Sequence, residues 1–361
     1  MKKLISLCLL LTLGIYAFAR NDDNCFYTEA STLTLVGKLF PETPNPYHRV
    51  DTVKYKGFTK SENFQVRMSA GIAVAFKTDS PYIRLKTDFG QLGRGLNTMG
   101  VAIKGFDLYI KDGVKWLWAA AHAAADKHEE DPFTLIANMD GSMHECLLYL
   151  PILSEINSLE IGIKEGCTIE AVPNPFRWRI GIFGSSFTHG ISISRSGMSY
   201  PAQFSRSTGL QLLSLGCSGN SKLQPYFAEA LAGADVDAFM FDSFSNPSSE
   251  QMRERLFPFI ERLQTSHPGK PLIFLRTIYR ERRNFDTAYE AREKNRIMVA
   301  DSLMRIACKR YKDVYYVESN ATSPDHETSV DGTHPNDYGY TLWARSIEKK
   351  VLAILRKYGI K

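Results

Sequence analysis

The fold of this chain is decided by one stretch, Arg179-Ile180-Gly181-Ile182-Phe183-Gly184-Ser185-Ser186-Phe187-Thr188-His189-Gly190. An apolar run of β type ends abruptly in Gly-Ser-Ser, so a single buried strand is expected to lead into a tight turn. In open α/β sheets, ligands and reacting groups gather outside the carboxyl ends of the strands. The turn therefore presents a side chain where such sheets place their chemistry, and Ser186 is the candidate nucleophile.

Downstream of this stretch, short apolar runs alternate with helical periodicity. Strands are expected at residues 179–183, 210–215, 238–241, 272–277 and 314–317. Helices are expected at residues 198–207, 223–231, 248–265, 288–311 and 337–358. This alternation indicates a parallel sheet with helices on both faces, an α/β domain over residues 176–361.

Residues 20–175 have a different, β-rich pattern. Short strands separated by turn residues are expected at residues 32–36, 65–68, 72–76, 82–87, 101–110, 146–151 and 159–163. Such spacing predicts a β-sandwich. The alanine-rich residues 119–127 fit either a short helix or an irregular insert. Pro173-Asn174-Pro175 marks the domain boundary, because two prolines interrupt a strand ladder or a helix.

Residues 1–19 have the features of a signal peptide. Lys2 and Lys3 precede an apolar run at residues 4–18, and Ala17-Phe18-Ala19 is a small-x-small cleavage site. The run is short for a membrane-spanning helix, which disfavours the alternative of an uncleaved anchor. We therefore expect export to the periplasm or the extracellular space, with no membrane span after cleavage.

The formal net charge of the chain argues against strongly acidic partners. Cleavage after Ala19 removes two lysines and no acidic residue, which lowers the formal net charge from +5 to +3. That charge is too small to favour nucleic acid or an anionic membrane as a partner. The sequence leaves the oligomeric state open.

Five cysteines remain after cleavage, an odd number that cannot all pair. They are Cys25, Cys146, Cys167, Cys217 and Cys308. A disulfide between Cys146 and Cys167 and free, buried thiols are both compatible with the sequence. No Cys-x-x-Cys pair or Cys/His ligand spacing occurs, so we expect no metal site and no cofactor.

Three further polar segments follow predicted strands or precede the last predicted helix. They are Gly216-Cys217-Ser218-Gly219-Asn220, Asp242-Ser243-Phe244-Ser245-Asn246-Pro247 and Asp331-Gly332-Thr333-His334. In a doubly wound sheet such positions converge on one crevice. Taken alone, Ser186 fits a helix N-cap and Asp331 a turn residue. Their joint occurrence, in this order, favours a catalytic site.

These segments resemble the sequence blocks of the SGNH (GDSL-type) hydrolase family. Block I is Gly184-Ser185-Ser186-Phe187-Thr188, block II centres on Gly219, block III on Asn246, and block V is Asp331-Gly332-Thr333-His334. The chain more narrowly resembles the two-domain members found in Bacteroidetes, through residues 197–201, 215–220 and 331–337 and through Gly105-Phe106-Asp107-Leu108-Tyr109. This resemblance implies a flavodoxin-like three-layer α/β/α hydrolase domain preceded by a jelly-roll-like β-sandwich.

The resemblance also implies a catalytic mechanism. His334 would take the proton of Ser186 and Asp331 would orient the imidazole, because a serine hydroxyl is a poor nucleophile without a base. The oxyanion would be held by the backbone N–H groups of Ser186 and Gly219 and by the side-chain amide of Asn246.

This sequence departs from the common family pattern at three positions. Ser185 stands where an aspartate is usual, and Phe244 and Pro247 stand where the block III glycine and aspartate are usual. The role of Asn246 is therefore less firmly implied than the triad.

Other polar residues have competing explanations. Arg276, Arg280, Arg282 and Arg283 cluster near the end of the fourth predicted strand of the α/β domain. They fit either a solvated loop face or a site for an anionic substrate group such as a uronic acid carboxylate. Asp107 and Tyr109 fit a structural role, with a buried carboxylate accepting from backbone groups. His189 is given at most a pocket-lining role.

Together these features predict an exported serine esterase. The resemblance and the expected export imply hydrolysis of a short acyl ester, acetyl above all, on a carbohydrate, so the expected partner is a small-molecule or glycan ester. A lipid or lysophospholipid esterase is the alternative among enzymes, and a carbohydrate-binding protein with an inactive hydrolase domain is the alternative of another class. Because the proline-bearing linker is short and stiff, we also hypothesise that the sandwich forms one wall of the Ser186 cleft.

Overall fold

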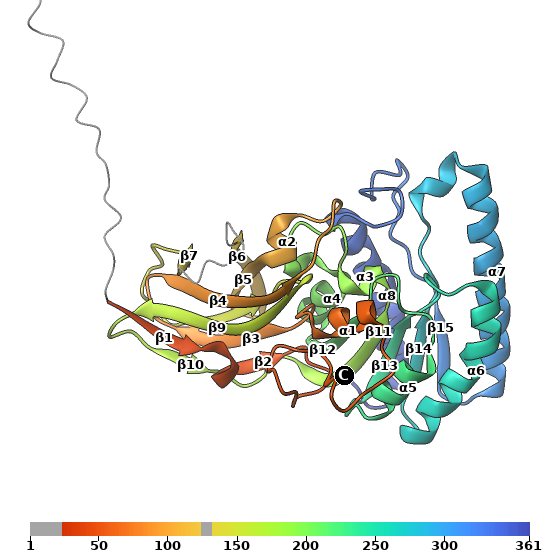
Figure 1. Ribbon diagram of the computed structural model, residues 1–361, viewed down its shortest axis with the longest axis horizontal. Helices are drawn as coiled ribbons and strands as arrows, with labels where there is room; N and C mark the ends of the chain where they lie inside the picture. The colour runs from red at the N-terminus through yellow and green to blue at the C-terminus, as the bar shows by residue number, and fades with distance from the viewer. Residues whose placement is uncertain (1–23, 124–131) are drawn as a thin grey trace, which may run out of the picture.

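The computed structural model describes residues 24–123 and 132–361. The expected signal peptide, residues 1–19, lies outside the described part of the chain. Figure 1 shows two halves side by side, with antiparallel sheets on the left and a helix-covered sheet on the right.

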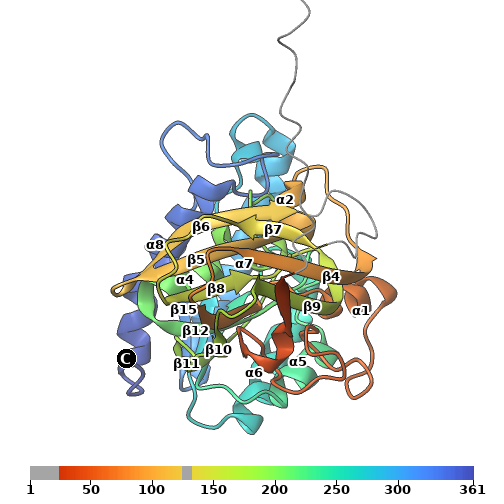
Figure 2. The ribbon, with the colours of Figure 1, turned by 90° about the vertical axis from the view of Figure 1, so that its left-hand side faces the viewer.

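Two antiparallel sheets form the N-terminal half. One has the order β1 (Cys25–Glu29), β9 (Ser154–Lys164), β4 (Ile83–Leu92) and β7 (Phe133–Ile136). The other has the order β10 (Ile169–Ala171), β3 (Ala73–Thr78), β8 (His144–Tyr149), β5 (Gly105–Asp112) and β6 (Lys115–Ala123), with β2 (Thr34–Val36) beside β3. The sheets pack through alternate apolar residues, which confirms the predicted β-sandwich; in Figure 2 it faces the viewer.

The central strands β3 and β8 of the second sheet are largely buried on both faces. Val74 and Phe76 of β3 point into the sandwich core. Ala73 and Ala75 of the same strand belong to a second cluster that includes Ala202 of helix α4 (Tyr200–Thr208), in the C-terminal half. The sandwich therefore uses the outer face of this sheet to dock on the α/β domain.

Three expectations for the N-terminal half are wrong. Residues 65–68 do not form a strand, because residues up to Arg67 belong to helix α1 (Lys60–Arg67), which starts with a capping box between Thr59 and Glu62. Within the expected strand 101–110, the first residues belong to the short helix α2 (Gly100–Lys104), and the strand β5 begins only at Gly105. Residues 119–123 are neither a helix nor an irregular insert, because they belong to strand β6. The rest of the alanine-rich segment, residues 124–127, lies outside the described residues.

The C-terminal half is built on a five-stranded parallel sheet. Its order is β12 (Leu210–Gly216), β11 (Arg177–Gly184), β13 (Ala238–Asp242), β14 (Leu272–Leu275) and β15 (Val314–Val317). In chain order this is 2-1-3-4-5, the flavodoxin-like arrangement that was expected. The chain changes direction across the sheet between β11 and β13, so the crevice for a ligand is expected at the carboxyl end of β11.

Helices cover both faces of this sheet, as predicted. One face carries α3 (Ser186–His189), α4 and α8 (Asp337–Arg356), and the other carries α5 (Pro225–Ala232), α6 (Ser249–Ser266) and α7 (Thr287–Arg310). Strand β13 supplies both layers, since Ala238 and Met240 pack on the first face and Phe239 and Phe241 on the second. Short 3-10 turns lie at Ala30–Thr32, Ser196–Met198 and Glu281–Asn284.

The two halves share their cores. Leu39, Val50 and Val66 from the N-terminal half are buried in the same cluster as the side chains of α5 and α6. The buried guanidinium of Arg49 donates to the carbonyl oxygens of Met68 (2.8 Å) and Gly216 (2.9 Å), one in each half. This sharing means that the halves fold against each other.

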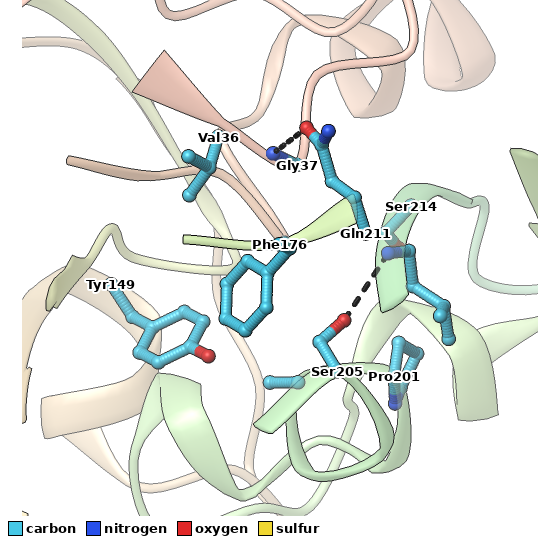
Figure 3. A pocket seen from close by; sticks show the side chains of 11 residues that line it. Val36, Gly37, Tyr149, Phe176, Pro201, Ser205, Gln211 and Ser214 are labelled. Atoms are coloured by element: carbon cyan, nitrogen blue, oxygen red, sulfur yellow. Dashed lines mark hydrogen bonds between the residues drawn. The ribbon is translucent and has the colours of Figure 1, made fainter. Parts of the chain in front are cut away.

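A small cavity marks the junction of the halves (Figure 3). It has a volume of about 20 Å³, which suits a single water molecule and not a sugar. Across it, Oε1 of Gln211 accepts from the backbone N–H of Gly37 (3.2 Å). The cavity is therefore a packing feature of the interface.

The signature Gly-x-Asp-Leu-Tyr segment joins the halves. Asp107, fully buried on β5, accepts from Nη1 of Arg195 (2.9 Å) and from the backbone N–H of Gly197 (2.8 Å). A Cβ on Gly197 would lie 2.5 Å from the Tyr109 ring, so only glycine fits there. The expected structural role of Asp107 is confirmed, and the contact explains why two distant motifs occur together.

Candidate active site

Ser186 lies at the carboxyl end of the central strand β11, at the first position of helix α3. Ser185 is the N-cap, and its side chain accepts from the backbone N–H of Phe187 (3.2 Å). The N-cap explanation considered for Ser186 therefore belongs to its neighbour. Ser186 makes no such cap contact, and its hydroxyl faces His334.

A buried carboxylate holds the turn that carries Ser186. Oδ2 of Asp242, at the end of β13, accepts from the backbone N–H (3.1 Å) and hydroxyl (2.7 Å) of Ser185 and from the hydroxyl of Thr188 (3.1 Å). Burial raises the pKa of Asp242 to about 6, against the effect of these hydrogen bonds. A Cβ on Gly184 would lie 2.0 Å from Oγ1 of Thr188, so the Gly-Ser-Ser-x-Thr pattern is a packing requirement of this turn.

His334 and Asp331 reach Ser186 from the loop that precedes α8. Nε2 of His334 lies 3.0 Å from Oγ of Ser186, and Nδ1 lies 2.8 Å from Oδ2 of Asp331. The backbone N–H groups of Thr333 (2.9 Å) and His334 (2.7 Å) donate to Oδ1 of Asp331. The structure thus brings together three residues whose spacing in the chain is as large as 148 positions.

This arrangement has the geometry of a nucleophile, a base and an orienting carboxylate. Partial burial by itself would raise the pKa of Asp331, but hydrogen bonds from the His334 side chain and backbone, Asn97 and Thr333 together bring it well below its usual range. Asp331 is therefore anionic, which favours the His334 tautomer with its proton on Nδ1. Nε2 is then free to accept the proton of Ser186.

Two of the three expected oxyanion donors, Gly219 and Asn246, lie on neighbouring loops after β12 and β13. Gly219 is exposed and has φ = +72°, which glycine adopts without strain. Oδ1 of Asn246 accepts from the backbone N–H of Ser221 (3.2 Å), so the two loops are tied to each other. Phe244 is fully buried against Phe274, which accounts for an aromatic residue at the usual glycine position. The oxyanion role of Asn246 and Gly219 stays a prediction.

The structure separates the two arginines predicted to bind substrate. Arg276 forms a paired contact with Asp301 (both 2.9 Å) and lines a cavity of about 480 Å³ beside α7. Arg280 is instead buried, pairs with Glu293 (3.3 Å) and donates to the carbonyl oxygen of Ser245 (2.9 Å). Because its charge is satisfied inside the protein, Arg280 supports the loop of Asn246 and is not placed as an open anion site.

The remaining polar candidates lie away from the reacting groups. His189 is buried, and its Nε2 lies 2.7 Å from the carbonyl oxygen of Ile152, which makes it part of the interior and not of a pocket lining. Cys146 and Cys167 are both free thiols, so the disulfide left open by the sequence is not formed. In residues 24–123 and 132–361, no cluster of metal-ligating side chains occurs, and none of the helices there has the length and apolarity needed to span a bilayer.

Two residues at the site were missed by sequence reasoning. Asp242 lies in one of the three polar segments, but no role was predicted for it. Its place at the end of a central strand could have indicated that it lies at the site. Asn97 belongs to the sandwich, and its Nδ2 donates to Oδ2 of Asp331 (2.7 Å). No motif or periodicity marks Asn97, because its partner lies 234 positions away. The contact shows that the sandwich reaches Asp331, whereas its role as a wall of the Ser186 cleft stays a prediction.

Comparison with known proteins agrees with this geometry. Residues 177–352 match the GDSL-like lipase/acylhydrolase family, and residues 25–169 match the family described as the N-terminus of SGNH-hydrolase-type esterases. Comparison with curated proteins gives no match.

Solved structures share both halves of the fold. A GDSL-like lipase from Bacteroides ovatus has 38% identity and a TM-score of 0.87 over 92% of this chain and 98% of its own. A salicylyl-acyltransferase from a tetracycline biosynthetic pathway has 18% identity and a TM-score of 0.67 (93% and 99% covered). A family two carbohydrate esterase from Cellvibrio japonicus has 11% identity and a TM-score of 0.61 (92% and 98% covered). The last two show the fold alone, whereas the first, with both family matches, shows that this chain belongs to the SGNH (GDSL-like) hydrolases with an N-terminal Gly-x-Asp-Leu-Tyr domain.

Proposed function

We propose that this protein is an exported serine esterase that removes short acyl groups, acetyl first among them, from carbohydrates. The observation that carries the proposal is the chain of contacts from Oγ of Ser186 to Nε2 of His334 (3.0 Å) and from Nδ1 to Oδ2 of Asp331 (2.8 Å). Membership of a family of acylhydrolases makes ester cleavage the reaction that this chain of contacts serves.

In the proposed reaction, His334 accepts the hydroxyl proton as Oγ of Ser186 attacks the ester carbonyl. The tetrahedral oxyanion forms next to the backbone N–H groups of Ser186 and Gly219 and the amide of Asn246. His334 then returns the proton to the leaving alcohol, which gives an acyl-enzyme. Water, activated by the same imidazole, releases the acid and restores Ser186.

The substrate class is proposed from the family resemblance and from the expected export. A carbohydrate ester is the first substrate to test, because the resemblance of the sequence and the expected export both favour a glycan outside the cytoplasm. A lipid ester is the competing substrate, and binding without turnover is the competing function.

A panel of substrates separates these possibilities. Wild type and Ser186→Ala are assayed on p-nitrophenyl esters of increasing acyl length and on acetylated oligosaccharides, with released acid measured directly. We expect turnover of acetyl esters that the variant lacks. A preference for long acyl chains would support a lipid esterase, and glycan binding without turnover of any ester would overturn the proposal.

The location has its own test. Expression of the full chain with a C-terminal tag, followed by N-terminal sequencing of the product, is expected to give a mature chain that starts at Arg20. A product found in the cytoplasm with its leader intact would contradict export.

A further inference from the structure

Asn97 belongs to the sandwich, and its side-chain amide contacts Asp331 of the proposed triad. It lies in the segment that joins β4 to α2, where its Nδ2 donates to Oδ2 of Asp331 (2.7 Å) and lies 3.3 Å from Nδ1 of His334. None of the sequence blocks quoted for the family includes this residue.

The segment is built so that the amide has one orientation. Oδ1 of Asn97 accepts from the hydroxyl of Thr98 (3.3 Å), and the same hydroxyl oxygen accepts from the backbone N–H of Ser192 in the α/β domain (3.0 Å). Thr98 is buried, so the hydroxyl that engages Oδ1 of Asn97 is held inside the protein. With Oδ1 engaged by Thr98, the NH₂ group is the end that faces Asp331, and a carboxylate can only accept.

The amide completes the hydrogen bonding of Asp331. Two backbone N–H groups occupy Oδ1, and Asn97 and His334 occupy Oδ2 from two directions. The Asp331 side chain is about one-third exposed, so without the amide one lone pair of Oδ2 would face water and the carboxylate would be freer to rotate. The contact with Asn97 therefore fixes the direction in which Oδ2 meets Nδ1 of His334.

We propose that Asn97 is a positioning residue, supplied by the sandwich domain, which holds the Asp331 carboxylate against His334 and makes domain docking part of the catalytic arrangement. This inference rests on the proposed hydrolytic function of Ser186, His334 and Asp331. It gives the sandwich a role in the rate of the reaction, beyond that of a wall or a binding module.

The test compares two asparagines of the sandwich that each donate a hydrogen bond to an aspartate. The partner of Asn97 is Asp331 of the α/β domain, and the partner of Asn157 is Asp88 of the sandwich itself. Asn97→Ala and Asn97→Asp remove the donor at the site. Asn157→Ala and Asn157→Asp are the matched controls, because Nδ2 of Asn157 donates to Oδ2 of Asp88 (2.9 Å) on the exposed surface of the sandwich. Thermal unfolding identifies variants that are folded like wild type.

Steady-state kinetics on p-nitrophenyl acetate give the first readout. Because the lost hydrogen bond is made to a charged group that orients the base, kcat is expected to fall about tenfold to a hundredfold in Asn97→Ala. KM should change little, because Asn97 acts on the base and not on the substrate. A wild-type kcat in folded Asn97→Ala, or an effect confined to KM, would overturn the inference.

The pH profile gives the second readout. In Asn97→Asp a second carboxylate faces Asp331, so the two share a coupled titration and kcat/KM acquires a pH dependence that wild type and Asn157→Asp lack. The other charged groups near the pair are the same in every variant. Arg282 lies beside Gly332, and Arg280 lies over the Phe187 ring that contacts His334. Asp242 and Asp337 share the electrostatic surroundings of Tyr340 with Asp331. A profile with the wild-type shape in Asn97→Asp would contradict a positioning role.

A third readout needs no substrate, and so separates this inference from the proposed function. The proton of the hydrogen bond between Nδ1 of His334 and Asp331 is followed by proton NMR and assigned by its loss in His334→Ala. We expect it to shift or broaden in Asn97→Ala and to stay unchanged in Asn157→Ala. An unchanged resonance refutes the positioning role, whether or not an ester is turned over. A changed resonance in a protein that cleaves no ester refutes only the proposed function.

Discussion

Replacing Asp331 by asparagine is the most discriminating single change at the site. Oδ1 of Asp331 accepts two backbone N–H bonds, so the carbonyl oxygen of an asparagine is expected to stay in that place. Its NH₂ group then takes the Oδ2 position and faces Nδ1 of His334. A donor there requires Nδ1 to accept, which moves the imidazole proton to Nε2. Nε2 then faces Ser186 with its proton and cannot act as a base.

The expected size of the effect follows from this change of tautomer. In serine hydrolases, the equivalent change lowers kcat by about 10⁴-fold, which corresponds to about 5.5 kcal/mol of transition-state stabilisation. The side chain keeps its size and its contacts with the backbone. KM and thermal stability should therefore change far less than kcat.

The assay is steady-state hydrolysis of p-nitrophenyl acetate by wild type, Asp331→Asn and Asp235→Asn. Asp235 is a matched control because its side chain is 85% exposed and its Oδ2 lies 3.7 Å from Nε of its partner, Arg179. The control should have wild-type kinetics. If Asp331→Asn kept more than about a tenth of the wild-type kcat, Asp331 would not set the tautomer of the base and the proposed triad would be wrong.

Four further outcomes are expected. Ser186→Ala should lose turnover of every ester while its urea midpoint stays that of wild type, and residual turnover well above background would contradict the nucleophile. Burial, followed by the nearby Arg49 charge, lowers the pKa of His189 to about 3. Since an unfolded histidine titrates near 6.5, the free energy of unfolding should fall by about 1.4 kcal/mol per pH unit as the pH drops below that value, and less steeply in His189→Gln. Asp107→Ala leaves buried donors unpaired and should cost about 3–5 kcal/mol in urea unfolding, whereas the exposed Asp112→Ala should cost little. The fragment 176–361 should show no cooperative unfolding transition, because residues of the N-terminal half complete its core; a sharp transition would refute that dependence.

Much of the α/β domain was predictable from local sequence. Each strand of the parallel sheet is a short apolar run, and each helix has its own periodicity, so the information lies within a few residues of each element. The place of Ser186 followed from the end of one such run. The blocks around Gly219, Asn246 and His334 were found because each directly follows or precedes an element.

The N-terminal half was harder to predict, for identifiable reasons. Strand β3 was predicted at residues 72–76, but its burial on both faces depends on the α/β domain that packs against its outer face. Helix α1 was mistaken for a strand because its apolar residues are few, although the capping box of Thr59 and Glu62 was present in the sequence. The burial of Arg280 against Glu293 was equally hidden, because a charged side chain is buried only when packing supplies a partner.

The sequence was therefore enough to predict the order of the elements in the α/β domain, the fold class and the identities of the three residues expected to react. Those features depend on periodicity and on short motifs, which neighbouring residues carry. The folded structure was needed to show that the sandwich completes the core of the α/β domain and that Asn97 contacts Asp331, 234 positions away in the chain. Contacts of that kind depend on how two independently patterned halves pack, and no local pattern records the face that one half presents to the other.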